Sequence, residues 1–254
     1  MRTLLILLAL SYVSFARGCS CVTDLIVDRV ESSGFIAAVT ILDTRPVDTL
    51  DGYHRVKIRI EELYKGTPRT EILLHSQLNS SCAFLPRTGS QWLLFAQTFQ
   101  GKLSFSYCSG NEEITRTKWA GATRANRNHY AGVSRVIGFL RYLRANDIEP
   151  TNTYGLGIGY TDDADQLRGY ANPEQDFALF RIRVDEDLNI RKVTGLKRFA
   201  NRKLDRAIRR GIRASGKAYR WKWDSIPTAT EVYLAVFYYG KEGDAPSFVS
   251  CFDL

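Results

Sequence analysis

The sequence has no excess of proline or glycine: 7 prolines and 19 glycines among 254 residues are near average usage. These frequencies exclude collagen-like and low-complexity chains. Hydrophobic residues reach 44% and aromatic residues 12%, which is enough apolar surface to offset the entropy lost on ordering the chain. A wholly disordered chain is therefore excluded, and the length fits one or two globular domains.

Histidine is scarce. The three histidines, His54, His75 and His129, have no metal-ligand spacing to any cysteine. No nucleophile elbow precedes an Asp and a His in the order that α/β-hydrolases need. The glycine-rich segment 155–159 matches neither nucleotide-loop pattern. We therefore expect no enzyme, no bound metal and no cofactor.

No run of apolar residues approaches the roughly 20 that span a bilayer. The apolar run 4–15 follows Arg2 and precedes the small-x-small segment 16–18. This arrangement predicts a signal peptide over residues 1–18, cleaved so that Cys19 becomes the first residue. A lipoprotein signal that leaves Cys19 lipidated is the alternative. We expect a secreted or periplasmic protein.

All five cysteines follow the predicted cleavage site. Export favours disulfides over reduced thiols, and five cysteines leave at least one unpaired. The spacing by itself leaves the connectivity open. The cysteines are Cys19, Cys21, Cys82, Cys108 and Cys251.

The first half of the mature chain predicts an antiparallel β-barrel or sandwich. Short segments with strand-like composition are separated by turn dipeptides such as Asp51-Gly52 and Lys65-Gly66. The expected strands are 35–42, 53–60, 71–75, 91–97 and 102–107. Apolar residues at intervals of three and four predict an amphipathic helix over 128–145, packed on the barrel.

The second half predicts a smaller α+β domain. Residues 147–173, which are rich in glycine and acidic residues, are expected to form a linker. Strands are expected over 177–184, 190–194 and 230–239, with a helix around 204–212 before the last strand. The predicted order is β-β-α-β.

Several residues of the first half carry a resemblance to a known family. They are Cys-Ser-Cys-Val at 19–22, Ser81-Cys82, Trp-Leu-Leu at 92–94 and Lys-Leu-Ser-Phe-Ser-Tyr-Cys-Ser at 102–109. Residues 19–146 resemble the netrin-like fold, an OB-like barrel, and most closely the inhibitory domain of the tissue inhibitors of metalloproteinases. The resemblance implies disulfides Cys19–Cys82 and Cys21–Cys108. The family's third bridge in this domain and its second, cysteine-rich domain are absent.

The resemblance also implies a mechanism. The α-amino nitrogen and carbonyl oxygen of Cys19 would chelate the zinc of a partner protease, at the position that a catalytic zinc leaves open for water. Ser20 would enter the specificity pocket of the protease. Cys21, Val22 and Ser81 would complete the contact surface. Other netrin-like modules only bind partners, and this stays the alternative.

The second half resembles the C-terminal domain of the bacterial energy transducer TonB over residues 172–245, within a predicted domain 174–254. No transmembrane anchor or proline-rich spacer accompanies it, so the resemblance implies an envelope protein-binding fold rather than energy transduction. The matching residues are 180–193, 201–207, 221–223, Pro227 and the strand near Val232.

Residues 191–222 contain thirteen Lys and Arg residues against Asp205 alone, within a chain of formal net charge +8. The cluster fits a solvated helix face, or contact with an anionic envelope surface or an acidic partner. Export argues against nucleic acid, so none is expected.

These features together predict an exported protein-binding module of a bacterial envelope, with metalloprotease inhibition through Cys19 as its most specific form. The alternative is a non-inhibitory periplasmic protein, envelope-binding or structural, that acts through the C-terminal α+β domain.

Overall fold

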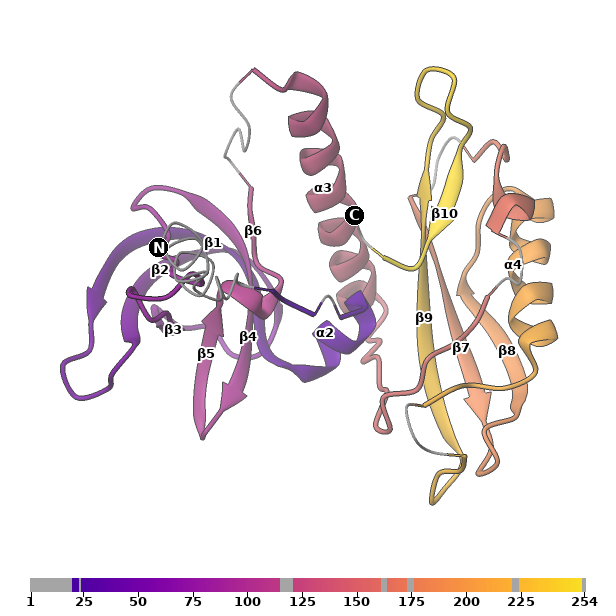
Figure 1. The fold of residues 1–254 in the computed structure, drawn as a ribbon, viewed down its shortest axis with the longest axis horizontal. Helices are drawn as coiled ribbons and strands as arrows, with labels where there is room; N and C mark the ends of the chain where they lie inside the picture. The colour runs from indigo at the N-terminus through magenta and orange to yellow at the C-terminus, as the bar shows by residue number, and fades with distance from the viewer. Residues whose placement is uncertain are drawn as a thin grey trace, which may run out of the picture.

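The computed structural model describes residues 20–22, 24–114, 121–160, 164–172, 176–220 and 224–252. A β-barrel lies at one end of the long axis of the molecule and helix α4 (Arg202–Ser215) at the other (Figure 1). Helix α3 (Thr123–Ala145) and a second β-sheet lie between them (Figure 1). The predicted signal peptide and Cys19 lie outside the described residues.

Five strands close the barrel in the order β1-β2-β3-β5-β4, because β1 pairs with both β2 and β4. The two-residue strand β6 (Glu112–Glu113) extends the sheet beside β4. The five strands are β1 (Ser33–Pro46), β2 (Tyr53–Lys65), β3 (Glu71–His75), β4 (Gln91–Phe99) and β5 (Lys102–Ser106). The pairings are antiparallel except that β3 and β5 run parallel, which corrects the expected all-antiparallel barrel.

Alternation along the strands places one set of side chains inside the barrel. In β2, the buried residues alternate with exposed ones from Val56 to Arg59. In β1, Phe35, Ala37 and Val39 point into the barrel core, whereas Ile36 contributes to a second core on the outer face. Both faces of β1 are therefore covered, which explains its long buried run.

Helix α3 begins five residues before the predicted start at residue 128. Val133, Leu140 and Leu143 are buried as the periodicity indicates, but Tyr130 is 36% exposed. The buried face of α3 packs with α2 (Ile26–Ser32) against the outside of the barrel.

The second sheet has the order β10-β9-β7-β8 with antiparallel pairings. The predicted β-β-α-β order is present, with one further strand after it. One face of the sheet packs on α4 and the other on α3. The strands are β7 (Phe177–Val184), β8 (Ile190–Lys197), β9 (Thr230–Tyr239) and β10 (Phe248–Ser250).

The α3 core joins the two halves of the molecule. Phe139 of α3 has its ring centroid 5.4 Å from that of Phe177 in β7 and 6.1 Å from that of Phe237 in β9. The same core includes Leu93 and Phe95 of the barrel. The two sheets therefore share one hydrophobic core through α3.

The described part of segment 147–173, expected as a linker, packs against the second sheet. Leu156, Ile158 and Leu167 (the last in the short helix η2, Ala164–Leu167) are buried in the core beneath α4. The buried Asn152 side chain donates hydrogen bonds to Asp28 Oδ1 at 2.7 Å and to the Leu156 carbonyl at 3.1 Å. Asn152 thereby ties this segment to α2.

Within the described ranges, no helix combines the length and the apolar character needed to cross a membrane.

Candidate binding site at the amino-terminal segment

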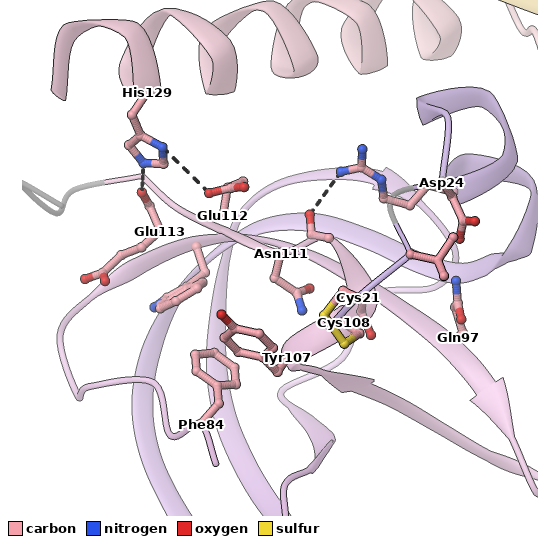
Figure 2. A pocket seen from close by; sticks show the side chains of 15 residues that line it. Cys21, Asp24, Phe84, Gln97, Tyr107, Cys108, Asn111, Glu112, Glu113 and His129 are labelled. Atoms are coloured by element: carbon pink, nitrogen blue, oxygen red, sulfur yellow. Dashed lines mark hydrogen bonds and ion pairs between the residues drawn. A yellow bond between two sulfur atoms is a disulfide. The ribbon is translucent and has the colours of Figure 1, made fainter. Parts of the chain in front are cut away.

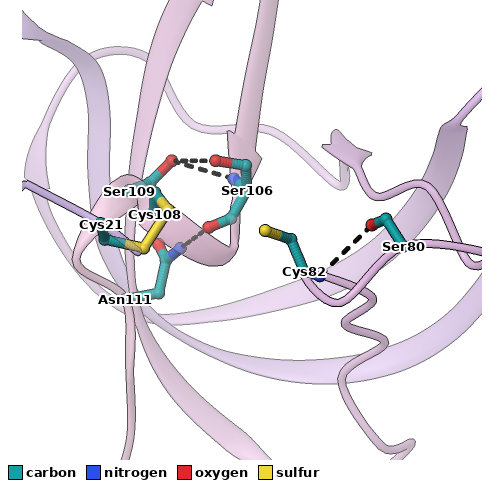
Figure 3. The surroundings of a disulfide bond; sticks show 7 residues. All are labelled: Cys21, Ser80, Cys82, Ser106, Cys108, Ser109 and Asn111. Atoms are coloured by element: carbon teal, nitrogen blue, oxygen red, sulfur yellow. Dashed lines mark hydrogen bonds between the residues drawn. A yellow bond between two sulfur atoms is a disulfide. The ribbon is translucent and has the colours of Figure 1, made fainter. Parts of the chain in front are cut away.

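Residues 20–22 lie against the barrel, held by a disulfide between Cys21 and Cys108 (Figure 3). The two Cα atoms are 5.2 Å apart and the cysteines are 87 residues apart in sequence. Ser20 is exposed, and the side chain of Val22 is 87% exposed. The segment is thus covalently anchored while its neighbouring side chains face solvent.

A short 3-10 helix, η1 (Tyr107–Ser109), presents Cys108 to this disulfide. Its start is capped by the Ser109 hydroxyl, which accepts a hydrogen bond from the Ser106 backbone N–H at 2.9 Å (Figure 3). The Asn111 amide donates to the Ser106 carbonyl, and its oxygen accepts from the Phe95 N–H, both at 2.8 Å. These bonds tie the turn to β4 through Asn111, which bridges the Ser106 carbonyl and the Phe95 N–H.

Gly110 ends this short helix in the left-handed region, with φ of 73°. A Cβ at this position would lie 2.7 to 2.9 Å from the Arg29 side chain, so a larger residue is excluded unless Arg29 moves. Arg29 is 8% exposed, donates to the Gly110 carbonyl at 3.1 Å and stacks over the Phe95 ring. Helix α2 and the turn that carries Cys108 are therefore locked together.

A pocket of about 430 Å³ opens beside the disulfide (Figure 2). Its walls come from the amino-terminal segment, α2, the loop before β4, β4 itself, the segment 107–113 that follows β5, and the start of α3. The lining residues are Cys21, Val22, Asp24, Arg29, Phe84, Trp92, Gln97, Tyr107, Cys108, Ser109, Gly110, Asn111, Glu112, Glu113 and His129.

One wall of the pocket is aromatic. The Phe84 ring meets Trp92 edge to face at 5.2 Å and Tyr107 at 6.3 Å between centroids. Trp92 donates its indole N–H to the Ser90 hydroxyl at 2.8 Å. Tyr107 is 54% exposed. Large rigid aromatic side chains of this kind are enriched at protein interfaces.

The opposite wall is polar, and its charges are paired. His129 Nε2 donates to the Glu113 backbone carbonyl at 2.9 Å, and its Nδ1 lies 3.7 Å from a Glu112 carboxylate oxygen (Figure 2). The buried Glu113 carboxylate accepts from Arg87 at 3.1 Å. These contacts hold the His129 ring and the Glu113 carboxylate in fixed positions on this wall.

Loop 76–90 carries the other predicted contact residue, Ser81, which is exposed. Cys82 is disulfide-bonded, and its N–H donates to the Ser80 hydroxyl at 3.3 Å (Figure 3). The loop also exposes Leu78 (55%) and Leu85 (45%). Because Cys19 lies outside the described residues, the Cys19–Cys82 bridge, the lipidation alternative and the chelate stay predictions.

The structure therefore brings Cys21 and Val22 together with residues that the sequence did not single out as a site. Phe84, Tyr107 and His129 come from three separate segments. The sequence contained one indication that Tyr107 lies at the site, because it directly precedes Cys108. Phe84 and His129 belong to the site only because the fold places the loop before β4 and the start of α3 beside the disulfide.

Within the part of the chain that the structure describes, no group of three or more His, Cys, Asp or Glu side chains is arranged to hold a metal ion. Cys251 is a free, half-buried thiol in the second half. Burial raises its pKa above the usual range of a cysteine.

No protein-family model matches the chain, and no curated protein matches it.

Proposed function

We propose that the chain is an exported protein-binding module that contacts its partner through residues 20–22 and loop 76–90. In its most specific form, it inhibits a zinc metalloprotease through the α-amino group and carbonyl oxygen of Cys19. The observation that carries this proposal is the Cys21–Cys108 disulfide, which anchors the segment after Cys19 while Ser20 and Val22 stay exposed.

The barrel supports the proposal. A closed five-stranded barrel with a packed helix is the arrangement that the resemblance to OB-like, netrin-like domains implies. The disulfide and the capped turn at 106–109 hold the contact segment in one conformation. Such preorganisation lowers the entropy lost on binding.

The exposed apolar side chains also support a protein partner. Val22, Leu78 and Leu85 present their side chains to solvent on the amino-terminal segment and on loop 76–90. Covering a valine side chain on binding contributes roughly 1.5 kcal/mol or more.

The chemistry of the Cys19 amine supplies the most specific test. A free α-amino group has a pKa of about 7.7 to 8.0, so a neutral amine able to bind a metal is accessible near neutral pH. An amide nitrogen at the same place is a poor ligand. One additional residue before Cys19 therefore removes the ligand and leaves the barrel unchanged.

The experiment compares protein that begins at Cys19 with protein that carries one extra amino-terminal alanine. We expect the first to inhibit at least one zinc metalloprotease of a panel and the second to inhibit none. Equal activity of the two forms, or no inhibition while both stay folded and disulfide-bonded, would refute inhibition through Cys19.

A second comparison tests the contact surface. Val22→Ser should weaken binding to the inhibited protease about tenfold, because an exposed apolar contact is lost. The matched control is Phe252→Ser, which alters a 42% exposed apolar side chain after β10 and should leave affinity unchanged. An equal effect of both substitutions would place the contact elsewhere.

A further inference from the structure

Helix α4 presents a basic outer face. Its sequence contains six Lys and Arg residues against Asp205. The apolar residues Leu204, Ile208 and Ile212 are fully buried against the second sheet. The exposed basic residues recur at intervals that place them on the other side of the helix; they are Arg202, Lys203, Arg206, Arg210 and Arg213.

An open groove of about 640 Å³ lies on this face, between the β8–α4 loop and the first turns of the helix. Four arginines line it, with Asp205 as the one carboxylate among the lining residues. The lining is Arg198, Phe199, Ala200, Arg202, Asp205, Arg206 and Arg209. The groove therefore carries three more positive than negative side-chain charges.

The groove contains hydrogen-bonding atoms that lack partners among the described residues. Arg209 donates to Asp205 Oδ2 at 2.9 Å, but among the described residues its buried Nε atom has no acceptor and the buried Oδ1 atom of Asp205 has no donor. Guanidinium groups form paired hydrogen bonds with phosphate oxygens. A phosphate group in the groove would supply acceptors and offset the local positive charge.

We propose that the outer face of α4 binds the surface of an anionic phospholipid membrane, with the arginine groove holding a lipid phosphate. A row of exposed basic residues on one side of a helix is complementary to such a surface. The predicted export places the chain where lipid headgroups, rather than nucleic acids, are the abundant polyanion.

Membrane contact through α4 would also determine where the barrel lies relative to the bilayer. The barrel lies at the opposite end of the long axis from α4 (Figure 1). A molecule bound through α4 therefore holds the barrel, with Val22 and loop 76–90, away from the bilayer and accessible to a partner. Membrane contact and partner binding use separate surfaces, so each can be tested without the other.

The test measures binding of the full mature chain to vesicles of phosphatidylglycerol and phosphatidylethanolamine by co-sedimentation. The variant replaces Arg206, Arg210 and Arg213 with glutamine. Its matched control replaces exposed basic residues outside α4, namely Arg45, Lys57 and Arg127, and so removes the same charge. Circular dichroism establishes that both variants are folded.

We expect roughly fivefold weaker binding for each basic residue removed from the membrane surface, and hence about a hundredfold for the α4 variant. The control should stay within about twofold of the unchanged chain. Raising salt from about 0.1 M to about 1 M should release the protein, since the Debye length falls from about 10 Å to about 3 Å.

Four results would overturn the proposal. The first is absence of vesicle binding at low salt, and the second is an equal loss in the control variant, which would indicate net charge alone. The third is tighter binding of a single- or double-stranded oligonucleotide than of the vesicles. A further arm adds inorganic phosphate at constant ionic strength. Complete displacement from the vesicles would assign the groove to free phosphate instead of lipid and would also overturn the proposal.

Discussion

Replacing Phe139 with alanine should weaken the connection between the two sheets. The Phe139 side chain is fully buried and meets Phe177 and Phe237 edge to face. Truncation of a buried phenylalanine costs about 3 to 5 kcal/mol of unfolding free energy. Roughly 1 to 3 kcal/mol of that cost comes from the two aromatic pairs, at about 0.5 to 1.5 kcal/mol each.

The number of unfolding transitions should distinguish Phe139→Ala from substitutions of other core residues. Because Phe139 lies in the core that both sheets share, its truncation should also make the barrel and the second sheet unfold separately. The matched control is Phe180→Ala, also fully buried but on the face of β7 that packs on α4. Phe180→Ala should lower the unfolding free energy similarly and retain one transition.

The assay is guanidinium unfolding followed by circular dichroism, with hydrogen exchange to assign each transition to β4 or to β7 and β9. A loss below about 1 kcal/mol for Phe139→Ala, or two transitions in the unchanged protein, would refute the idea that the shared core couples the two sheets.

Three further outcomes are expected. Replacing both Cys21 and Cys108 with serine should cost about 2 to 4 kcal/mol; a loss below about 1 kcal/mol in guanidinium unfolding would contradict an anchoring role. Glu62→Gln should cost about 1 kcal/mol at pH 7, because Glu62 joins β2 to α3 through Arg141 at 2.7 Å. Hydrogen bonds from Arg141 hold the pKa of Glu62 below its usual value. The stabilisation by Glu62 is therefore present above the unfolded pKa near 4.3 and is lost as pH falls through the lower folded pKa. If urea unfolding showed Glu62→Gln to be destabilised equally at pH 7 and pH 2, this reasoning would be wrong. Cys251 should react with iodoacetamide at pH 8 at least about tenfold more slowly than a free peptide thiol, because burial raises its pKa; a rate equal to that of the peptide would exclude this protection.

Local patterns predicted most elements of the fold. Alternation over residues 53–60 identified the buried face of β2, and spacing of three and four identified the buried face of α3. The parallel pairing of β3 with β5 has no such signal. Alternation shows which side of a strand is buried, but not which strand lies beside it.

Segment 147–173 shows a second limit of local patterns. Its glycines and acidic residues are typical of a linker, yet Leu156 and Ile158 are buried beneath α4. Isolated apolar residues among polar ones show no periodicity. Their burial depends on the surface that the second sheet offers to them.

For the candidate site, the sequence indicated the cysteines and the residues beside them, but not the pocket. Phe84 and His129 lie in separate segments, and each is an ordinary residue in its own sequence context. Tyr107 differed only in directly preceding a cysteine. The free cysteine likewise could not be chosen by spacing, because five cysteines allow several connectivities.

The sequence by itself determined the short strands, the turns between them, the two amphipathic helices and the basic side of α4, because each depends on residues within one or two turns of chain. Spacing left the partner of Cys21 open, the resemblance implied Cys108, and the structure shows that pairing. Only the tertiary structure decided that α3 joins two sheets in one core and that a pocket opens beside the amino-terminal segment. These features join residues far apart in sequence, and the packing of the whole chain selects them.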